Sequence, residues 1–326
     1  MVSRRFGWWA VMVSLTALGI GMPARAADVS KYLPSDSDTA VTINVKQILS
    51  APLVQKYLMD RIKKELESNQ QAQQVMEKLG FDPLKDVSAI IVAGPMSDLQ
   101  NQSLPLVIIE GRFDVAKFQA LAKDIAKNEA KVKLHRSGGD IIYEIETEDD
   151  KPPMFTALLD SGNIVASTTK KRIEDALAIK AGTKPSNPKK ELAALLTNAN
   201  ANQSMGLFAL NSAIAAGNNA TDPKVQQLTK NIKNVTGGIT VGNDIQSEFL
   251  IHTEDDATAK ELSKMINGYL GLFKGLLGLQ AAQQPELAPV AELLNTFEVG
   301  STGKTAKLHS VITQSMIEKL IQNVGQ

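Results

Sequence analysis

The chain contains no cysteine among its 326 residues. This absence excludes disulfides, thiolate nucleophiles, cysteine-based metal sites and a lipid anchor attached through cysteine. The fold must therefore be stabilised by its core alone. With 43% apolar residues, the chain can bury such a core in one large domain or in two of medium size.

The chain also lacks an excess of charge, with 35 basic and 35 acidic residues. The first 26 residues hold three arginines and no acid, so 32 basic and 35 acidic residues follow them. No polybasic block is present, and we therefore expect no nucleic-acid partner. After the first 26 residues no apolar stretch is long enough to cross a membrane unaided.

The N-terminus has the three parts of a secretory signal peptide. Arg4 and Arg5 precede an apolar run over residues 6–22. An A-x-A triplet, closed by Ala26, follows this run. We expect residues 1–26 to be removed and the protein to be periplasmic or secreted. An uncleaved anchor is the alternative. The general secretory route is favoured over the twin-arginine route, because Phe6 directly follows the arginine pair.

The apolar pattern alternates between strand and helix periods along the chain. Strands are expected at 39–45, within 81–94 and at 104–113, with helices over 51–79 and 115–128. Short connections favour an α+β fold, a mostly antiparallel sheet with helices packed on one face. A doubly wound parallel sheet would need a helix between nearly every pair of strands, and the sequence lacks these helices.

The order of elements restarts in the second part of the chain. Residues 204–214 match 39–49 as a strand that leads into a helix, and later strands and helices correspond in order and apolar pattern. We predict two related α+β repeats, 27–183 and 184–326, the second without one hairpin. Chance likeness of two ordinary α+β segments is the alternative.

A possible phosphate-binding loop, GSTGKT, occurs within residues 297–310. A P-loop needs a glycine at the position of Glu298 and a helix after Thr305. Here a carboxylate stands in that place, and TAKLHSVIT alternates like a strand. We predict a hairpin turn and no nucleotide partner.

A second motif resembles part of a serine-enzyme signature. Ser167 and Lys170 form S-x-x-K, with 161–163 and 304–306 as candidate partner elements. Their order along the chain differs from that signature, and Ala306 stands where glycine is required. We expect Ser167 to finish a strand and cap the following helix.

Acidic and histidine residues were weighed as metal ligands. The tetrapeptide TEDD occurs at 147–150 and 253–256, and Asp36 and Asp38 alternate near the first strand. Carboxylates in this pattern could bind calcium, but neither TEDD continues as an EF-hand loop. The second TEDD is expected to begin a helix, where Asp255 and Asp256 oppose the macrodipole. The three histidines, His135, His252 and His309, lie far apart in the sequence. We therefore predict no metal site, no cofactor and no catalytic residue.

The segment 262–279, LSKMINGYLGLFKGLLGL, has apolar residues over one broad arc of a helix. Four glycines collect on another side, and each glycine destabilises a helix by about 1 kcal/mol relative to alanine. Core packing is the favoured interpretation, and a protein partner or a membrane surface remain alternatives. The residues of a possible interaction surface are Tyr269, Leu272, Phe273, Leu276 and Leu277.

Residues 33–94, with YLPSDSDTAVTINVKQIL and LGFDPLKDVSAIIVAG, resemble exported proteins common in planctomycete-type bacteria. The shared motifs are a Pro-x-Asp segment before the first strand and a Gly-φ-Asp-Pro turn before the second. These are structural turns, and the resemblance implies export without implying an activity or a functional residue.

Taken together, these features predict an exported, non-catalytic α+β protein that binds or scaffolds a protein or polymer of the cell envelope. The first alternative is an envelope hydrolase built on scattered serine, histidine and aspartate residues. The second alternative is a factor that associates with the membrane surface through residues 262–279.

Overall fold

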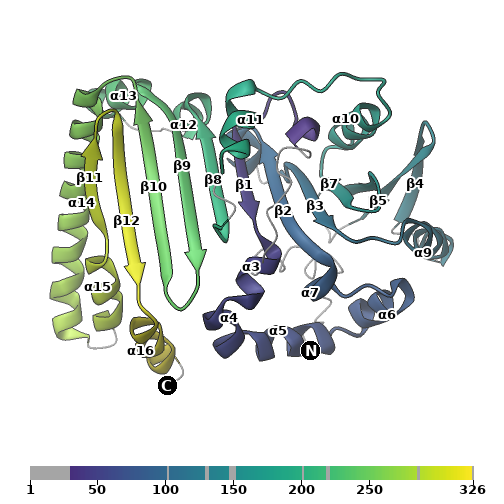
Figure 1. Ribbon diagram of the computed structural model, residues 1–326, viewed down its shortest axis with the longest axis horizontal. Coiled ribbons are helices and arrows are strands. Elements are labelled where there is room, and N and C mark those ends of the chain that lie inside the picture. Colours follow the sequence, from purple (N-terminus) through teal and green to yellow (C-terminus); the bar gives the residue numbers. More distant parts are fainter. Residues whose placement is uncertain are drawn as a thin grey trace.

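The computed structural model describes residues 30–100, 103–128, 132–146, 152–199, 202–217, 221–284 and 287–324. These residues form one twelve-stranded sheet in which every pair of neighbouring strands is antiparallel (Figure 1). The strand order is β11-β12-β10-β9-β8-β1-β2-β3-β7-β6-β5-β4. The predicted α+β class with antiparallel pairing is confirmed.

The first half of the sheet is formed by β1 (Thr39–Ile43), β2 (Val87–Gly94), β3 (Leu106–Gly111), β4 (Val132–Ser137), β5 (Asp140–Ile145), β6 (Met154–Leu158) and β7 (Asn163–Ser167). The second half is formed by β8 (Met205–Leu210), β9 (Ile232–Val241), β10 (Ile245–Thr253), β11 (Glu298–Thr302) and β12 (Thr305–Ile312).

The helices of the first half are η2 (Ser30–Tyr32), α3 (Val45–Ser50), α4 (Pro52–Tyr57), α5 (Met59–Ser68), α6 (Gln70–Leu79), α7 (Pro83–Asp86), α8 (Met96–Gln100), α9 (Val115–Asn128) and α10 (Lys170–Lys180). Those that follow are α11 (Lys190–Thr197), α12 (Asn211–Gly217), α13 (Pro223–Lys230), α14 (Asp256–Gln283), α15 (Ala288–Asn295) and α16 (Gln314–Val324).

The two halves meet where β1 pairs with β8, with Val41 opposite Leu207. Outward from this pair, the order β1-β2-β3-β7-β6 on one side corresponds to β8-β9-β10-β12-β11 on the other. The hairpin β4–β5 has no counterpart among the described strands of the second half. This shared order supports the division into repeats 27–183 and 184–326, which stays a prediction.

Helices cover both faces of the sheet around β1–β7, because these strands are apolar on both sides. Ala40 and Ile108 face a core that α10 and α11 complete, and Ile43 and Ile109 face a core completed by α3 and α4. The sequence led us to expect helices on a single face. In the second half, Leu228 of α13 and Leu262 of α14 pack with Ala306 in a smaller core.

The C-terminal helix α16 contacts α4, more than 250 positions earlier in the chain. The Lys56 ammonium lies 3.0 Å from a carboxylate oxygen of Glu318, and the Tyr57 hydroxyl donates to the same oxygen. Gln314 donates to it from one turn earlier on α16, at 2.9 Å. These hydrogen bonds, that of Tyr57 foremost, lower the pKa of Glu318 from 4.5 to about 2.

We expect Glu318→Gln to reduce the acid sensitivity of the fold. The folded-state pKa lies below the unfolded one, so ionised Glu318 contributes stability above pH 4.5 that is lost as the pH falls toward 2. The measurement is the urea midpoint of both proteins from about pH 5 to about pH 3. Glu292→Gln, which removes an exposed partner of Lys319 on α15, is the control. An unchanged pH slope in Glu318→Gln would contradict the linkage.

Candidate functional site

The helix α14 begins as the sequence predicts, with the second TEDD at its N-terminus. The Asp255 carboxylate accepts from the backbone N–H of Thr258 at 2.7 Å and caps the helix. The same bond lowers the pKa of Asp255. The first part of the helix then packs against the sheet, where Leu262 is buried and the Ser263 hydroxyl donates to the Gly300 carbonyl at 2.7 Å.

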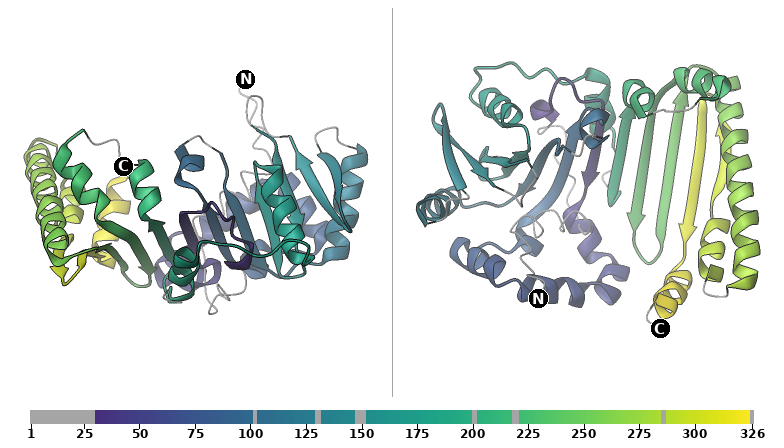
Figure 2. Two further views of the ribbon diagram at one scale, coloured as in Figure 1. Left: turned by 90° about the horizontal axis from the view of Figure 1, so that it is seen from above. Right: turned by 180° about the vertical axis from the view of Figure 1, so that it is seen from behind.

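The second part of α14 turns its apolar arc to solvent. The exposed fractions are 55% for Tyr269, 59% for Leu272, 60% for Phe273, 54% for Leu276 and 69% for Leu279. We call these five residues the α14 apolar face. In the three views of Figures 1 and 2, α14 forms one lateral end of the molecule, beside β11.

Core packing, the favoured interpretation from sequence, is therefore wrong for four of the five surface residues that we named. Tyr269, Leu272, Phe273 and Leu276 are exposed, and Leu277 is half-buried. Leu279 also belongs to the exposed set, although the sequence pattern did not lead us to name it. Burial holds at the beginning of the segment, where Leu262 and Met265 pack against Ala306.

The four glycines of α14 have no close neighbour among the described residues. A Cβ atom built at Gly268, Gly271, Gly275 or Gly278 meets nothing within 4 Å. These glycines are therefore not required for another element of this molecule to pack closely against α14. Each glycine destabilises the helix, and no contact within the described structure compensates for that loss.

The α14 apolar face carries little charge. Between Leu262 and Gln284 the chain has two lysines and no acidic residue. Lys274 is directed toward β11, where its ammonium donates to the Phe297 carbonyl at 3.2 Å, and Lys264 is exposed. An exposed apolar cluster with almost no charge is typical of a surface that another molecule covers.

We expect Gly271→Ala with Gly278→Ala to raise the melting temperature. Both methyl groups would enter open space, and each replacement favours the helix by about 1 kcal/mol, or about 2 °C or more for a chain of this size. The matched control is Gly206→Ala, where the added Cβ would lie 2.6 Å from Thr42 Oγ1; this variant should melt lower. A lower melting temperature in the α14 variant would show that these glycines are covered in the isolated protein.

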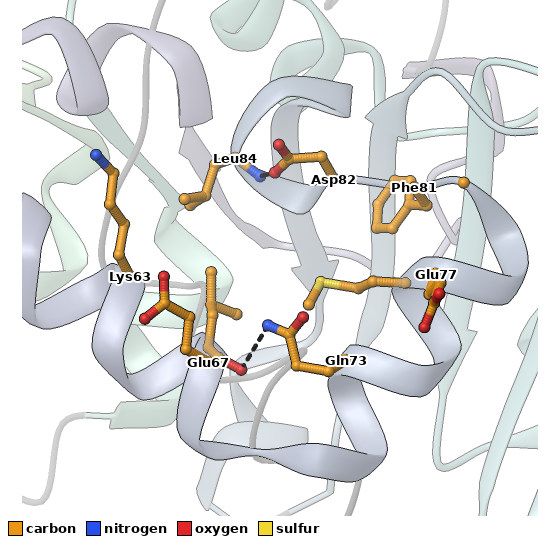
Figure 3. A pocket seen from close by; sticks show the side chains of 10 residues that line it. Lys63, Glu67, Gln73, Glu77, Phe81, Asp82 and Leu84 are labelled. Atoms are coloured by element: carbon orange, nitrogen blue, oxygen red, sulfur yellow. Dashed lines mark hydrogen bonds between the residues drawn. The ribbon is translucent and has the colours of Figure 1, made fainter.

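A second candidate is an open cavity of about 470 Å³ formed by α5, α6 and the turn into α7 (Figure 3). Leu66, Met76, Phe81 and Leu84 give it apolar surface, and the charged lining residues are Lys63, Glu67, Glu77 and Asp82. No sequence motif pointed to this cavity. In the sequence, only Gly80 marks this place as the end of a helix. In the structure Gly80 follows α6 with a φ of +61°.

Two polar groups that line this cavity are engaged in holding the local backbone. The Gln73 amide donates to the Leu66 carbonyl at 3.0 Å (Figure 3). Asp82 caps α7 by accepting from Leu84 N–H at 3.0 Å, and it pairs with Lys85 at 2.7 Å. These two groups are therefore committed to the local fold, and the α14 apolar face remains the stronger candidate.

The structure separates the residues of the serine-enzyme signature. Ser167 Oγ donates to the Leu104 carbonyl and accepts from Thr169 N–H, at 3.1 and 3.0 Å. Ser167 thus ends β7 as predicted, but the predicted helix cap is wrong, because the N-cap of α10 is Thr169 and no side chain caps this helix. Residues 161–163 lie at the opposite end of β7. Lys304 lies in the turn between β11 and β12, where Thr302 pairs with Thr305. The predicted hairpin at 297–310 is confirmed, with Gly303 at a φ of +52°.

The acidic candidates near the first strand are engaged in an ion-pair cluster and in a backbone hydrogen bond. Arg172 pairs with Asp98 at 2.8 Å and with Asp36 at 3.2 Å, and burial raises the pKa of Asp98. Asp38 accepts from Met96 N–H at 2.9 Å. The first TEDD, 147–150, lies outside the described residues. Within the described ranges, no three histidine or acidic side chains are grouped to hold a metal ion.

The histidines occupy three different surroundings. His135 pairs with Glu144 at 2.5 Å on the hairpin β4–β5. His252 contacts the hydroxyls of Thr236 and Thr305 at 3.4 and 3.3 Å, and burial lowers its pKa. His309 is on β12, opposite Glu248 of β10.

Among the described helices none is long and apolar enough to span a bilayer.

Comparison with known proteins finds no matching family model and no matching curated protein. Two solved structures are similar to this chain, crystal forms I and IV of TP0453, with 11% and 9% sequence identity. Each alignment covers 89% of this chain and 95% of the TP0453 chain, with TM-scores of 0.45 and 0.47. Likeness at this distance carries no inference about function, and the resemblance to planctomycete-type exported proteins stays a prediction.

Proposed function

We propose that this chain is an exported, non-catalytic protein of the cell envelope that acts by binding, and that the α14 apolar face is its docking surface. The observation that carries the proposal is the exposure of five large apolar side chains along the second half of one helix. Monomeric proteins rarely expose such a contiguous patch unless another molecule covers it.

Export is supported by the sequence. Arg4 and Arg5, the apolar run and the triplet closed by Ala26 match a cleavable leader. The absence of cysteine is compatible with an oxidising compartment, because no thiol can form an unwanted disulfide there.

A binding role is supported by the use of the polar side chains. Ser167, Asp255 and Asp82 each accept a backbone N–H at the end of a strand or the beginning of a helix. Such groups are committed to the fold, which favours binding over the alternative of an envelope hydrolase.

The proposal is tested by photo-crosslinking in cells that export the protein. A photoreactive residue at Leu276 or Leu279 should give a crosslinked product in the envelope fraction, because both positions lie on the α14 apolar face. The same residue at Leu134, an exposed leucine on the edge strand β4, is the matched control. Absence of any product at both α14 positions, with the protein exported and folded, would sink the proposal.

A membrane surface is the second candidate for the molecule that α14 contacts. The observation that favours it is the absence of any acidic residue between Leu262 and Gln284, combined with the exposed tyrosine, phenylalanine and leucines. Interfacial helices place such side chains among lipid headgroups. Two lysines provide only weak attraction to anionic lipid.

For this candidate we expect the protein to sediment with vesicles of phosphatidylethanolamine and phosphatidylglycerol. Phe273→Asp with Leu276→Asp should remove binding, because each charge would enter the apolar layer. Leu134→Asp is the control and should bind like the parent protein. Sedimentation that is unaffected in the folded α14 variant, or that never occurs, would eliminate a lipid surface.

A further inference from the structure

We propose that the docking surface described above is covered by a second copy of this chain, with the two α14 helices packed antiparallel about a twofold axis. This inference rests on the proposed function, since it names the occupant of the same surface. It is carried by the order of glycine and leucine residues along the outer side of α14, together with their exposure.

The outer side of α14 carries a regular stripe of four residues. Gly268, Leu272, Gly275 and Leu279 are spaced by four, three and four positions, the spacing that brings residues together along a helix–helix seam. At about 100° per residue the stripe lies opposite half-buried Leu277. It therefore points away from the rest of the molecule, where nothing described here obstructs a partner.

The stripe is self-complementary in the antiparallel direction. A twofold axis between Phe273 and Lys274 sets Leu272 against Gly275 of the partner subunit, and Leu279 against Gly268 of the partner subunit. A leucine then fills the space left by a glycine in each layer, as a knob fills a hole. Parallel packing would set leucine against leucine and glycine against glycine, which leaves voids.

The seam is confined to this stripe. One turn before it, Met265 packs against the core of the second half and is not offered to a partner. No stripe position from Gly268 to Leu279 is charged. The twofold arrangement therefore brings no like charges together and leaves no ionic group unpaired in the contact.

The two flanks of the stripe also differ in a way that suits an antiparallel pair. Tyr269 and Leu276 lie on one flank, more than half exposed, and a twofold axis brings this flank against the same flank of the partner subunit. Gly271 and Gly278 lie on the other flank and have open space at their Cβ positions. Glycines there let the two backbones approach closely.

The size of the surface determines the strength to expect. The α14 apolar face offers on the order of 500 Å² per subunit, at the upper end of the patches that monomers expose. Standard interfaces bury about 800 Å² per partner. The dimer should therefore dissociate on dilution, and self-association should appear in a concentration series.

The test is sedimentation velocity of the exported, processed protein from micromolar to hundreds of micromolar. The parent protein should shift from monomer to dimer. Gly275→Leu should remain monomeric, since it fills the hole required by Leu272, while its Cβ meets nothing within the monomer. Leu272→Gly with Gly275→Leu exchanges knob and hole and should restore the dimer. Leu134→Ser, at an exposed leucine on β4 that lies outside α14, should dimerise like the parent.

The direction of packing has an independent test, because the chain has no cysteine of its own. Leu272→Cys should form an intermolecular disulfide under mild oxidation, since the two positions are offset by about 4.5 Å along the helix axis. Leu279→Cys should not, because its copies are about 16 Å apart along the axis, beyond disulfide reach. Disulfides at both positions would overturn the antiparallel arrangement.

A protein that stays monomeric at every concentration would overturn the proposal, as would a dimer that Gly275→Leu leaves intact. Photo-crosslinking then separates the two levels of inference. Suppose that the protein is monomeric and that the crosslinked product at Leu276 does not have twice the mass of the chain. The α14 apolar face would then still be a docking surface, but its partner would not be a second copy. No product at all would remove both.

Discussion

The antiparallel pairing of β1 with β8 is the contact on which the rest of the structure depends. Five residue pairs, from Thr39 with Ala209 to Ile43 with Met205, join two sets of strands into one sheet. Ala40 and Phe208 of this pair belong to one core, and Ile43 belongs to the core on the opposite face. Separated halves would each expose an unpaired edge together with apolar side chains on both sides.

The outer strands of the continuous sheet are β4 and β11. β11 is flanked by α14, to which it is tied by the Ser263–Gly300 and Lys274–Phe297 hydrogen bonds. These bonds orient α14 about its own axis. With one side committed to the edge strand, the apolar arc of Tyr269, Leu272 and Leu276 is left on the outside. The exposure of the α14 apolar face is thus a consequence of how the sheet edge is covered.

Local features of the fold could be predicted because their physics is local. The hairpin at 297–310 follows from strand periodicity around Gly303, and the cap at Asp255 follows from the preference of helix ends for carboxylates. Antiparallel pairing follows from short connections. The burial of Tyr269, Leu272, Phe273 and Leu276 was expected wrongly, because an amphipathic pattern shows that a helix has an apolar side and not what that side meets.

By itself, the sequence determined the strand and helix types, the turn and cap residues, and the absence of thiol chemistry, since each depends on residues near one another in the chain. Only the tertiary structure decided that β1 meets β8, that helices cover both faces around β1–β7, and that the outer side of α14 has no partner in the described molecule. The first of these depends on a contact between segments more than 150 positions apart, Val41 with Leu207, and the other two depend on which elements the completed sheet brings together. Local periodicity carries no information about which distant surfaces meet.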